Sequence, residues 1–340
     1  MTLATLWFLV TALLWTGFFV LEGFDLGVGM LHTVVSRDEP GRRAAINTIG
    51  PLWDGNEVWL VVAAAAMFAA FPDWYATMFS GLYPALVLLL AGLVVRGVSF
   101  EFRGKGEGAR WIHTWDTLLT VGSLLVPLLT GIALGDLLHG LPIDRTKEFT
   151  GGPGDLFPAY AVFTGVTLVL LCLLHGATFL ALKTTGTVEA RASLLARRIG
   201  PFTALALLAF LPWTHATAGR GVLPNIVQLL AALAVLAALW LVVRHREGWA
   251  FVATTAAMAT TVLSLFLDLY PRLMVSSTDP AYDLTVRGSA SGSYALTVMS
   301  VVALVFFPLV LAYQGWTYHV FRLRLSDEQF AAPTSTSTSE

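Results

Sequence analysis

Long runs of apolar residues dominate the chain, and their spacing predicts a bundle of membrane-spanning helices. A spanning helix needs about 20 mostly apolar residues, and nine segments meet this requirement. Runs of this length and uniformity exclude barrel strands, which are shorter and alternate in polarity. The predicted spans are residues 6–30, 51–71, 76–98, 114–138, 157–182, 200–216, 223–243, 249–269 and 292–318.

The connections between these spans are too short to hold a separate soluble domain. Residues 1–325 are therefore expected to form a single transmembrane domain. The first apolar run has no Lys or Arg before it and no small-residue cleavage site, so we expect a retained helix rather than a signal peptide. Residues 326–340 are polar and low in complexity, which predicts a disordered tail.

The composition agrees with an all-α integral membrane protein. Hydrophobic residues make up 56% of the chain and charged residues 12%, against about 25% charged in an ordinary soluble domain. The sequence has no basic patch interleaved with aromatic residues and therefore does not indicate a nucleic acid partner. The one cysteine, Cys172, lies inside an apolar run, which excludes a disulfide or a cysteine-rich zinc motif within the chain.

The distribution of positive charge predicts the orientation of the bundle. With nine spans, successive connections alternate between the two sides of the membrane. Fifteen of the 20 Lys and Arg residues then fall on one side and five on the other. Because cytoplasmic loops carry the excess of Lys and Arg, we expect the N-terminus outside and the C-terminus in the cytoplasm.

Several ionisable residues lie inside the predicted spans, where each costs about 2.5–3.5 kcal/mol at a helix centre on insertion scales. The first span carries Glu22 and Asp25, three residues apart and therefore close on one helix surface. Gly23 and Gly27 beside them form a small-xxx-small pair that would let another helix approach closely. The alternative for Asp25 is a solvated residue near the helix end without a function.

The second span begins with "GPLWDGNEVW", in which Asp54 and Glu57 are again three residues apart. Acids in a first helical turn are favoured by the helix dipole, and Trp53 suits the membrane interface. That interpretation accounts for Asp54. It accounts less well for Glu57, which lies one turn deeper, where the dipole effect fades.

The third span ends with Arg96 and Glu101, and the fourth begins with His113 and Asp116. Under the predicted topology, all these acids lie in the cytoplasmic third of the bundle. Carboxyl groups that converge on one side can relay protons from water toward a buried centre. The acids expected to form this proton path are Asp25, Asp54, Glu57, Glu101 and Asp116, with Glu22, Trp53, Asn56, Arg96 and His113 as supporting residues.

Haem binding by this chain is not expected, because axial ligands would have to lie deep in the helices. His175 is the only histidine well within a predicted span, and His215 lies near an outer end. A single buried histidine is more often a hydrogen-bonded core residue than a ligand. No phosphate loop, nucleophile elbow or zinc motif is present. The residues favour the movement of protons or quinones over that of electrons.

At these residues the chain resembles subunit II of the cytochrome bd quinol oxidases, with the character of an actinobacterial member. The similarity is dense over residues 17–142 and continues in the same order to about residue 320. The words that carry it are "EGFDLGVGML" (22–31), "RRAAINTIGPLWDGNEVWL" (42–60), "FAAFPDWYATMFSGLY" (68–83), "RGVSFEFRGK" (96–105), "GSLLVPLLTGIALGDLLHGLP" (122–142), "GATFL" (176–180) and "YPRLMVSST" (270–278).

The resemblance implies two four-helix bundles plus one peripheral helix, paired with subunit I in a bacterial cytoplasmic (inner) membrane. It implies that haems b558, b595 and d and the main quinol site belong to subunit I, and that this chain carries no metal or redox centre. The complex would oxidise quinol or menaquinol and reduce dioxygen to water without pumping protons. A small single-helix accessory subunit is a further possible partner.

Matched residue by residue, the resemblance places Asp25, Asp54, Glu101 and Asp116 on a cytoplasmic proton path. Some relatives carry Asp where this chain has Glu101, and the carboxyl group is kept. Asn56 and Trp53 lie in the same word as Asp54 and are expected to order water. Two alternatives remain open: a proton-coupled transporter that acts without haem, for which related halves and broken helices would be expected, and a purely structural subunit.

Overall fold

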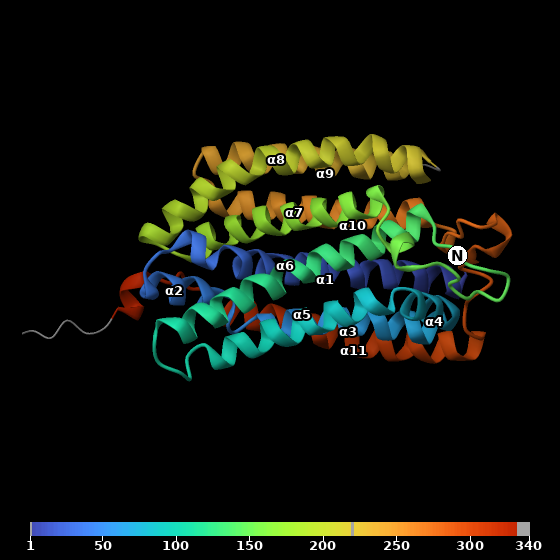
Figure 1. Cartoon of the computed structure of the whole chain (residues 1–340), viewed down its shortest axis with the longest axis horizontal. Helices are drawn as coiled ribbons and strands as arrows, with labels where there is room; N and C mark the ends of the chain where they lie inside the picture. The colour runs from blue at the N-terminus through green and yellow to red at the C-terminus, as the bar shows by residue number, and fades with distance from the viewer. Residues whose placement is uncertain (1, 219–220, 332–340) are drawn as a thin grey trace, which may run out of the picture.

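In the part of the chain that the structure describes, nine long helices run nearly parallel to one another along the long axis of the molecule (Figure 1). The computed structural model describes residues 2–218 and 221–331. The long helices are α1 (Leu3–Val35), α3 (Trp53–Ala70), α5 (Tyr83–Phe102), α6 (Ala109–His139), α7 (Ala159–Lys183), α8 (Gly186–Ala218), α9 (Val222–Val243), α10 (Glu247–Leu269) and α11 (Ser293–Val320).

The helices form layers, with α1 near the centre and α11 at the edge (Figure 1). Helices α8 and α9 lie on one side, next to α7 and α10, and α3, α5 and α11 lie on the other. Helix α1 packs against α3, α6, α7 and α10. In the most apolar window of each helix, 56% of the residues of α1 are buried but only 6% of those of α11. An apolar helix that remains so exposed must be covered by lipid or by another chain.

Eight helices within the described residues are long and apolar enough to cross a membrane. Helix α3 is not among them, although the sequence predicted a span there. Its 18 residues begin with Trp53, Asp54, Asn56 and Glu57, which lower its mean hydropathy. The difference from the nine predicted spans therefore comes from the polar residues that open α3.

Two short helices were not predicted, and one long helix extends further than predicted. Helix α2 (Glu39–Ile49) lies in a segment interpreted as a loop. Helix α4 (Pro72–Gly81) covers the predicted connection at residues 72–75 and the start of the predicted span 76–98. Helix α8 starts at Gly186 rather than near residue 200. Its first turns carry Arg191, Arg197 and Arg198, whose charge marks the end of an apolar run but does not end a helix.

The two ends of the bundle differ in structure. At the end that holds α2, which we call the basic end, α1, α5, α7, α9 and α11 finish and α3, α6, α8 and α10 begin (Figure 1). The opposite end carries an antiparallel pair of short strands, β1 (Arg272–Met274) and β2 (Leu284–Thr285), and the short 3-10 helices η1 (Pro153–Leu156) and η2 (Pro280–Tyr282). The fifteen Lys and Arg residues grouped by the charge count all lie toward the basic end.

The chain after α11 is ordered for longer than predicted. A 3-10 helix, η3 (Asp327–Phe330), packs against α2 and α8 inside the segment from residue 326 for which the sequence predicts disorder. Thr187 donates a hydrogen bond of 2.8 Å to Asp327, and the guanidinium of Arg43 lies 5.8 Å from the ring centre of Phe330. These contacts explain why the polar segment is held. Residues 332–340 of the predicted tail lie outside the described residues.

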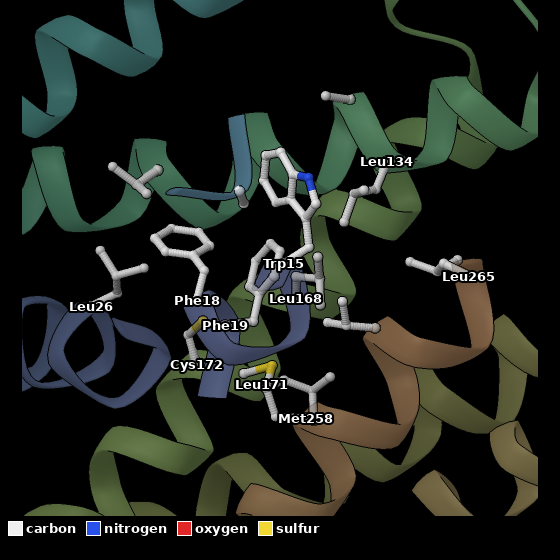
Figure 2. Packing of buried hydrophobic residues seen from close by; sticks show 14 of the residues in the cluster. Trp15, Phe18, Phe19, Leu26, Leu134, Leu168, Leu171, Cys172, Met258 and Leu265 are labelled. Atoms are coloured by element: carbon white, nitrogen blue, oxygen red, sulfur yellow. The ribbon is translucent and has the colours of Figure 1, made fainter. Parts of the chain in front are cut away.

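The core is built around α1, whose aromatic side chains meet apolar residues of α7 and α10. Figure 2 shows Phe18 and Phe19 of α1 beside Cys172 and Met258, and all four side chains are buried. The predicted close approach at Gly27 is confirmed: a Cβ atom there would lie 2.0 Å from the carbonyl oxygen of Cys172 in α7. This tight crossing fixes the depth of Glu22 and Asp25, which belong to the same stretch of α1.

Candidate functional site

A buried arginine joins two glutamates from different helices in the centre of the bundle. Nη1 of Arg96 in α5 lies 2.6 Å from Oε1 of Glu22 in α1 and 3.0 Å from Oε2 of Glu57 in α3. Arg96 and Glu22 have no exposed surface, while the Glu57 side chain is 24% exposed. The three residues, more than 30 positions apart along the chain, therefore form one ionic cluster that reaches from the core toward the surface.

Aromatic side chains cover the guanidinium group of Arg96. Its Cζ atom lies 5.9 Å from the ring centre of Trp53 and 5.3 Å from that of Phe100. The two rings stack on each other with their centres 4.9 Å apart. Cation–π contact of this kind stabilises a desolvated guanidinium. Trp53, predicted as an interfacial residue, thus also shields the buried cation.

Asp25 lies one turn from Glu22 on α1 and contacts a second set of polar residues. Asn56 donates a hydrogen bond of 2.6 Å from Nδ2 to Oδ2 of Asp25. Gln314 and Tyr318 of α11 both donate to Oδ1 of Asn56, at 2.7 and 2.9 Å. The amide of Asn56 is therefore fixed with its NH2 group toward Asp25. Four helices contribute to the combined group of Glu22, Asp25, Asn56, Glu57, Arg96, Gln314 and Tyr318, which we call the central cluster.

The central cluster contains more carboxyl groups than cations. Arg96 is the one cation among three carboxyl groups, and Asp25 and Glu22 are fully buried. Within the described part of the chain, Oδ1 of Asp25 and Oε2 of Glu22 have no hydrogen-bond partner. A buried carboxylate without a partner is costly, and such groups are ordinarily neutralised by a proton or satisfied by water. The cluster thus has the chemistry of a proton-holding site.

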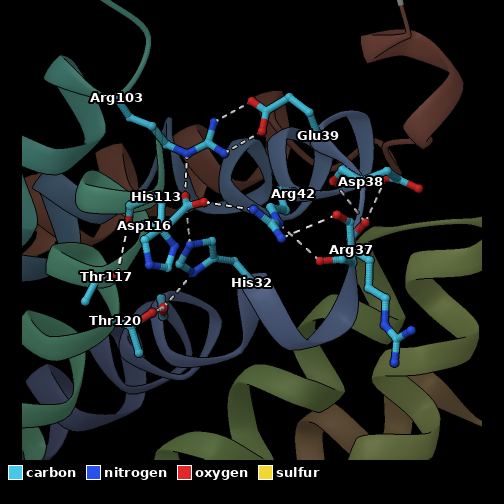
Figure 3. Close-up of polar contacts among 12 residues, drawn as sticks. His32, Arg37, Asp38, Glu39, Arg42, Arg103, His113, Asp116, Thr117 and Thr120 are labelled. Carbon is cyan, nitrogen blue, oxygen red and sulfur yellow. Dashed lines mark hydrogen bonds and ion pairs between the residues drawn. The ribbon is translucent and has the colours of Figure 1, made fainter. Parts of the chain in front are cut away.

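A second ionic group lies at the basic end around Asp116 of α6 (Figure 3). Oδ1 of Asp116 accepts from Nε of Arg103 at 2.6 Å and lies 3.1 Å from Nε2 of His32. Its Oδ2 accepts from Nη1 of Arg42 at 3.2 Å. Both carboxylate oxygens of Asp116 are therefore paired, in contrast to those of Glu22 and Asp25.

Glu39 extends this group onto α2. Both nitrogens at the end of Arg103 donate to Glu39, each at 2.8 Å, in a bidentate pair. Burial lowers the pKa of Arg103, but the hydrogen bonds to Glu39 and Asp116 outweigh this effect and raise it. The pairs tie the end of α5 to α1, α2 and α6, so this group, the Asp116 cluster, anchors the basic end.

Replacing Arg103 with Gln is expected to destabilise the protein by about 3–5 kcal/mol, because Asp116 would lose its closest partner while 1% exposed. The expected result is a clear fall in the thermal unfolding midpoint of the purified complex. Arg110→Gln removes the same charge from an exposed position at the same end and serves as the control. Equal midpoints for the two variants would contradict an anchoring role for the Asp116 cluster.

The structure does not bring all the predicted acids together. Asp54, Glu101 and His113 are exposed on the surface of this chain. Within the described residues, neither the Asp54 nor the Glu101 side chain makes a hydrogen bond or an ion pair. Asp54 lies one helical turn from Glu57, and the negative charges of the two carboxylates repel each other. The acids that were predicted to lie together are thus divided between the central cluster, the Asp116 cluster and two separate exposed carboxylates.

Several buried or half-buried polar residues were missed by the sequence analysis. Gln314 and Tyr318 lie four residues apart in the last span, a spacing that places both on one face of a helix. His32, in the last turn of α1, was hidden by its position near a helix end. Asp136 in α6 and Asp268 in α10 lie toward the opposite end, and Gln228 donates to Asp268 at 2.9 Å. A search for every polar residue within an apolar run would have found them.

Both ring nitrogens of His175 take part in hydrogen bonds. Nδ1 lies 2.8 Å from Oγ1 of Thr254, and Nε2 lies 3.2 Å from the carbonyl oxygen of Val20. Phe251 stacks on the imidazole with ring centres 4.7 Å apart. A metal could reach either nitrogen only by displacing one of these partners. Within the described residues, no group of three or more His, Cys, Asp or Glu side chains could hold a metal ion.

The fold and the buried clusters define a multi-pass α-helical membrane protein with titratable groups inside its bundle. Comparison with known families identifies it further: the profile of cytochrome bd terminal oxidase subunit II matches residues 3–321. The chain belongs to this family. It is a subunit of a quinol oxidase complex, and the resemblance found in the sequence is confirmed.

Curated relatives and a solved structure agree with this assignment. The chain is 43% identical to the cytochrome bd ubiquinol oxidase subunit 2 of Bacillus subtilis, covering 96% of this chain and 98% of the relative. It is 32% identical to the cytochrome bd-I ubiquinol oxidase subunit 2 of Escherichia coli K12, covering 97% of each. The bd oxidase from Geobacillus thermodenitrificans contains a chain with a similar fold, at a TM-score of 0.77 and 20% identity, covering 94% of this chain and 99% of that one.

Proposed function

We propose that this subunit takes up protons at its basic end and holds them in the central cluster for the reduction of dioxygen to water. The observation that carries the proposal is the excess of buried carboxyl groups over cations around Arg96. Glu57, at 24% exposure, links the surface to Glu22 and Asp25. Asp54 and Glu101 are the surface acids of the path, and Trp53, Asn56 and Arg96 position its buried part.

Asp116 has a different part in this proposal. Two guanidinium groups and His32 already balance its carboxylate. Asp116 therefore stabilises the basic end and does not relay protons. His113 and Glu101 lie on the exposed surface nearby and attract protons and counter-ions to this end. In this assignment Asp116 leaves the predicted proton path. Its interior part consists of Asp25 and Glu57 together with Glu22, which the sequence predicted as a supporting residue.

The proposed orientation places the basic end in the cytoplasm and the N-terminus outside, in a bacterial cytoplasmic membrane. The excess of Lys and Arg at this end supports it. Helix α3 is the ninth span in this arrangement, because Asn56 and Glu57 in its first turns belong to the central cluster and contact Asp25 and Arg96. Helices α1, α3, α5 and α6 then form one four-helix bundle, α7–α10 form the second, and α11 is peripheral.

The proposed partner is cytochrome bd subunit I, which would carry haems b558, b595 and d and the main quinol site. A small single-helix accessory subunit is a further proposed partner. The exposed apolar side chains of α5 and α11 support an extensive contact with another chain or with lipid. Both ring nitrogens of His175 are engaged in hydrogen bonds, which supports the proposal that this histidine is a core residue and not a haem ligand.

The test is the variant Glu57→Gln in the purified oxidase complex. The glutamine side chain can still accept a hydrogen bond from Arg96 but cannot take up a proton, so we expect quinol oxidation to slow by at least about tenfold. The haem content, read from the absorption spectrum, should stay unchanged. Glu107→Gln, at an exposed position of the same end, is the control. Unchanged turnover in the Glu57 variant would favour the purely structural role.

A further inference from the structure

A cavity of about 340 Å³ opens at the basic end between α7, α10 and the last turn of α11. It is separate from the Asp116 cluster and touches the central cluster at Tyr318, which forms part of its wall. Its walls combine the aromatic side chains of Phe179, Phe251 and Phe321 with charged side chains from three segments. A volume of this size accommodates a small ligand or the polar part of a larger one.

The charges that line the cavity are mostly positive. Lys183, Arg322 and Arg324 contribute three cations, and Glu247 contributes the one acid. The ammonium group of Lys183 donates to the backbone carbonyl oxygens of Phe321 and Leu323, which leaves it one further N–H. Nη2 of Arg324 contacts Glu189 at 3.0 Å and donates to the carbonyl oxygen of Ala181 at 2.8 Å, while its other nitrogens make no hydrogen bond or ion pair within the described residues. Arg322 is exposed and uses only Nη1, which contacts His319. The cavity therefore offers unused donors for an anion.

The start of α10 adds to this preference for negative charge. Its first residues, Glu247 and Gly248, line the cavity, and its N-cap residue, Arg246, makes no side-chain cap. The first backbone N–H groups of a helix without such a cap are available to an anion. The cavity thus joins a helix N-terminus to three basic side chains.

The outside of the cavity is suited to lipid chains. Trp249 and Val252 of α10 and Trp316 of α11 are 64%, 53% and 61% exposed. These side chains belong to helices long and apolar enough to span a membrane. A molecule whose polar part lies in the cavity would therefore have a hydrophobic surface beside it for its apolar part.

We propose that this cavity binds the phosphate headgroup of an anionic phospholipid, with its acyl chains along α10 and α11. Basic pockets between spanning helices at the membrane surface bind such headgroups, because each Lys or Arg near the surface attracts their negative charge. Arg322 and Arg324 contact the phosphate, and Lys183 joins the headgroup to the end of α11. This assignment does not depend on the proton path, since the basic side chains that carry it, Lys183, Arg322 and Arg324, do not belong to the central cluster.

The test measures lipid binding to the delipidated oxidase complex, by native mass spectrometry and by the thermal unfolding midpoint. Short-chain phosphatidylglycerol is compared with phosphatidylcholine of the same chain length and with inorganic phosphate. We expect phosphatidylglycerol to bind at least about fivefold more tightly than phosphatidylcholine and to raise the midpoint. Equal binding of the two lipids would overturn the proposal. An equal effect of inorganic phosphate would show a free anion site instead of a lipid site.

The variant Arg322→Gln places the binding in the cavity. We expect it to weaken phosphatidylglycerol binding about fivefold, and to leave the midpoint without lipid unchanged because Arg322 is exposed. Arg198→Gln removes the same charge from an exposed position of α8, outside the cavity, and is the matched control. Equal losses in the two variants would mean that general surface charge, and not this cavity, attracts the lipid.

Discussion

Replacement of Arg96 with Gln is expected to prevent stable assembly of the subunit or to lower its stability by about 3–5 kcal/mol. Among the described residues, the guanidinium group is the one cation within contact distance of both Glu22 and Glu57. Without it, Glu22 would be a buried carboxyl group at 0% exposure with no ionic partner. The measurement is the yield and the thermal unfolding midpoint of the purified complex, compared with those of the unaltered protein.

Two further variants separate the effect of losing the charge of Arg96 from the effect of losing its packing against aromatic neighbours. In the double variant Glu22→Gln/Arg96→Gln, the buried charge that Arg96 balances is removed together with Arg96. We expect this protein to recover a large part of the lost stability, because both buried charges are gone. Arg96→Lys keeps the charge but lacks the planar group that stacks on Trp53 and Phe100, so its stability should lie between the two. No recovery in the double variant would mean that Arg96 acts mainly through packing.

The fold of this chain could be predicted from its sequence to a large extent, because the bilayer imposes a simple requirement on spanning segments. Apolar runs gave the long helices, and their order survived in the structure. The errors fall where that requirement does not apply. Helix α2 and the first turns of α8 are rich in charged residues and lie beyond the apolar windows, so hydropathy carries no signal for them.

The residues of the candidate site could be predicted from the sequence, but which of them contact one another could not. Glu22, Asp25, Glu57 and Arg96 could be found because an ionisable residue in an apolar run requires an explanation. The orientation of each helix about its own axis decides which of these side chains come into contact. That orientation cannot be read directly from the sequence. Asp54 and Glu57 are three residues apart, yet one is exposed and the other reaches Arg96.

Contacts between residues far apart in the sequence could not be predicted from the motifs. Gln314 and Tyr318 follow Asn56 by more than 250 positions and still determine how its amide is turned. Helix α11 is otherwise almost entirely exposed. Its two polar contacts with α3 thus connect the most peripheral helix to the central cluster. A change in the position of α11, through lipid or a partner chain, would act on Asn56 and through it on Asp25.

Replacement of Asp25 with Asn is expected to slow quinol oxidation by at least about tenfold, since proton transfer through positioned groups typically contributes 10²–10⁴-fold. The substitution preserves the shape of the side chain, and the amide oxygen that it introduces can still accept the hydrogen bond from Asn56. The protein should therefore fold, and the haem spectrum of the complex should be unchanged. What the variant loses is a group that can bind and release a proton.

The solvent isotope effect distinguishes a proton-carrying role from a structural one. If Asp25 passes protons onward, their delivery becomes the slow step in the variant, and turnover in D₂O should fall further below turnover in H₂O than it does in the unaltered protein. A purely structural role would lower turnover equally in both solvents, through loss of folded complex. The ratio of the two rates, measured at matched haem content, therefore tests the chemistry at this residue directly.

Asp136 provides the matched control for Asp25. It is also a fully buried aspartate in a spanning helix, and its carboxyl oxygens have no hydrogen-bond partner among the described residues, but it lies near the end of α6, toward the opposite end of the bundle. Asp136→Asn should leave both turnover and the isotope effect close to normal. If it slowed turnover and Asp25→Asn did not, protons would be taken up from the opposite end. Equal effects of the two variants would mean that any loss of a buried carboxyl group disturbs the complex, and the central cluster would lose its special role.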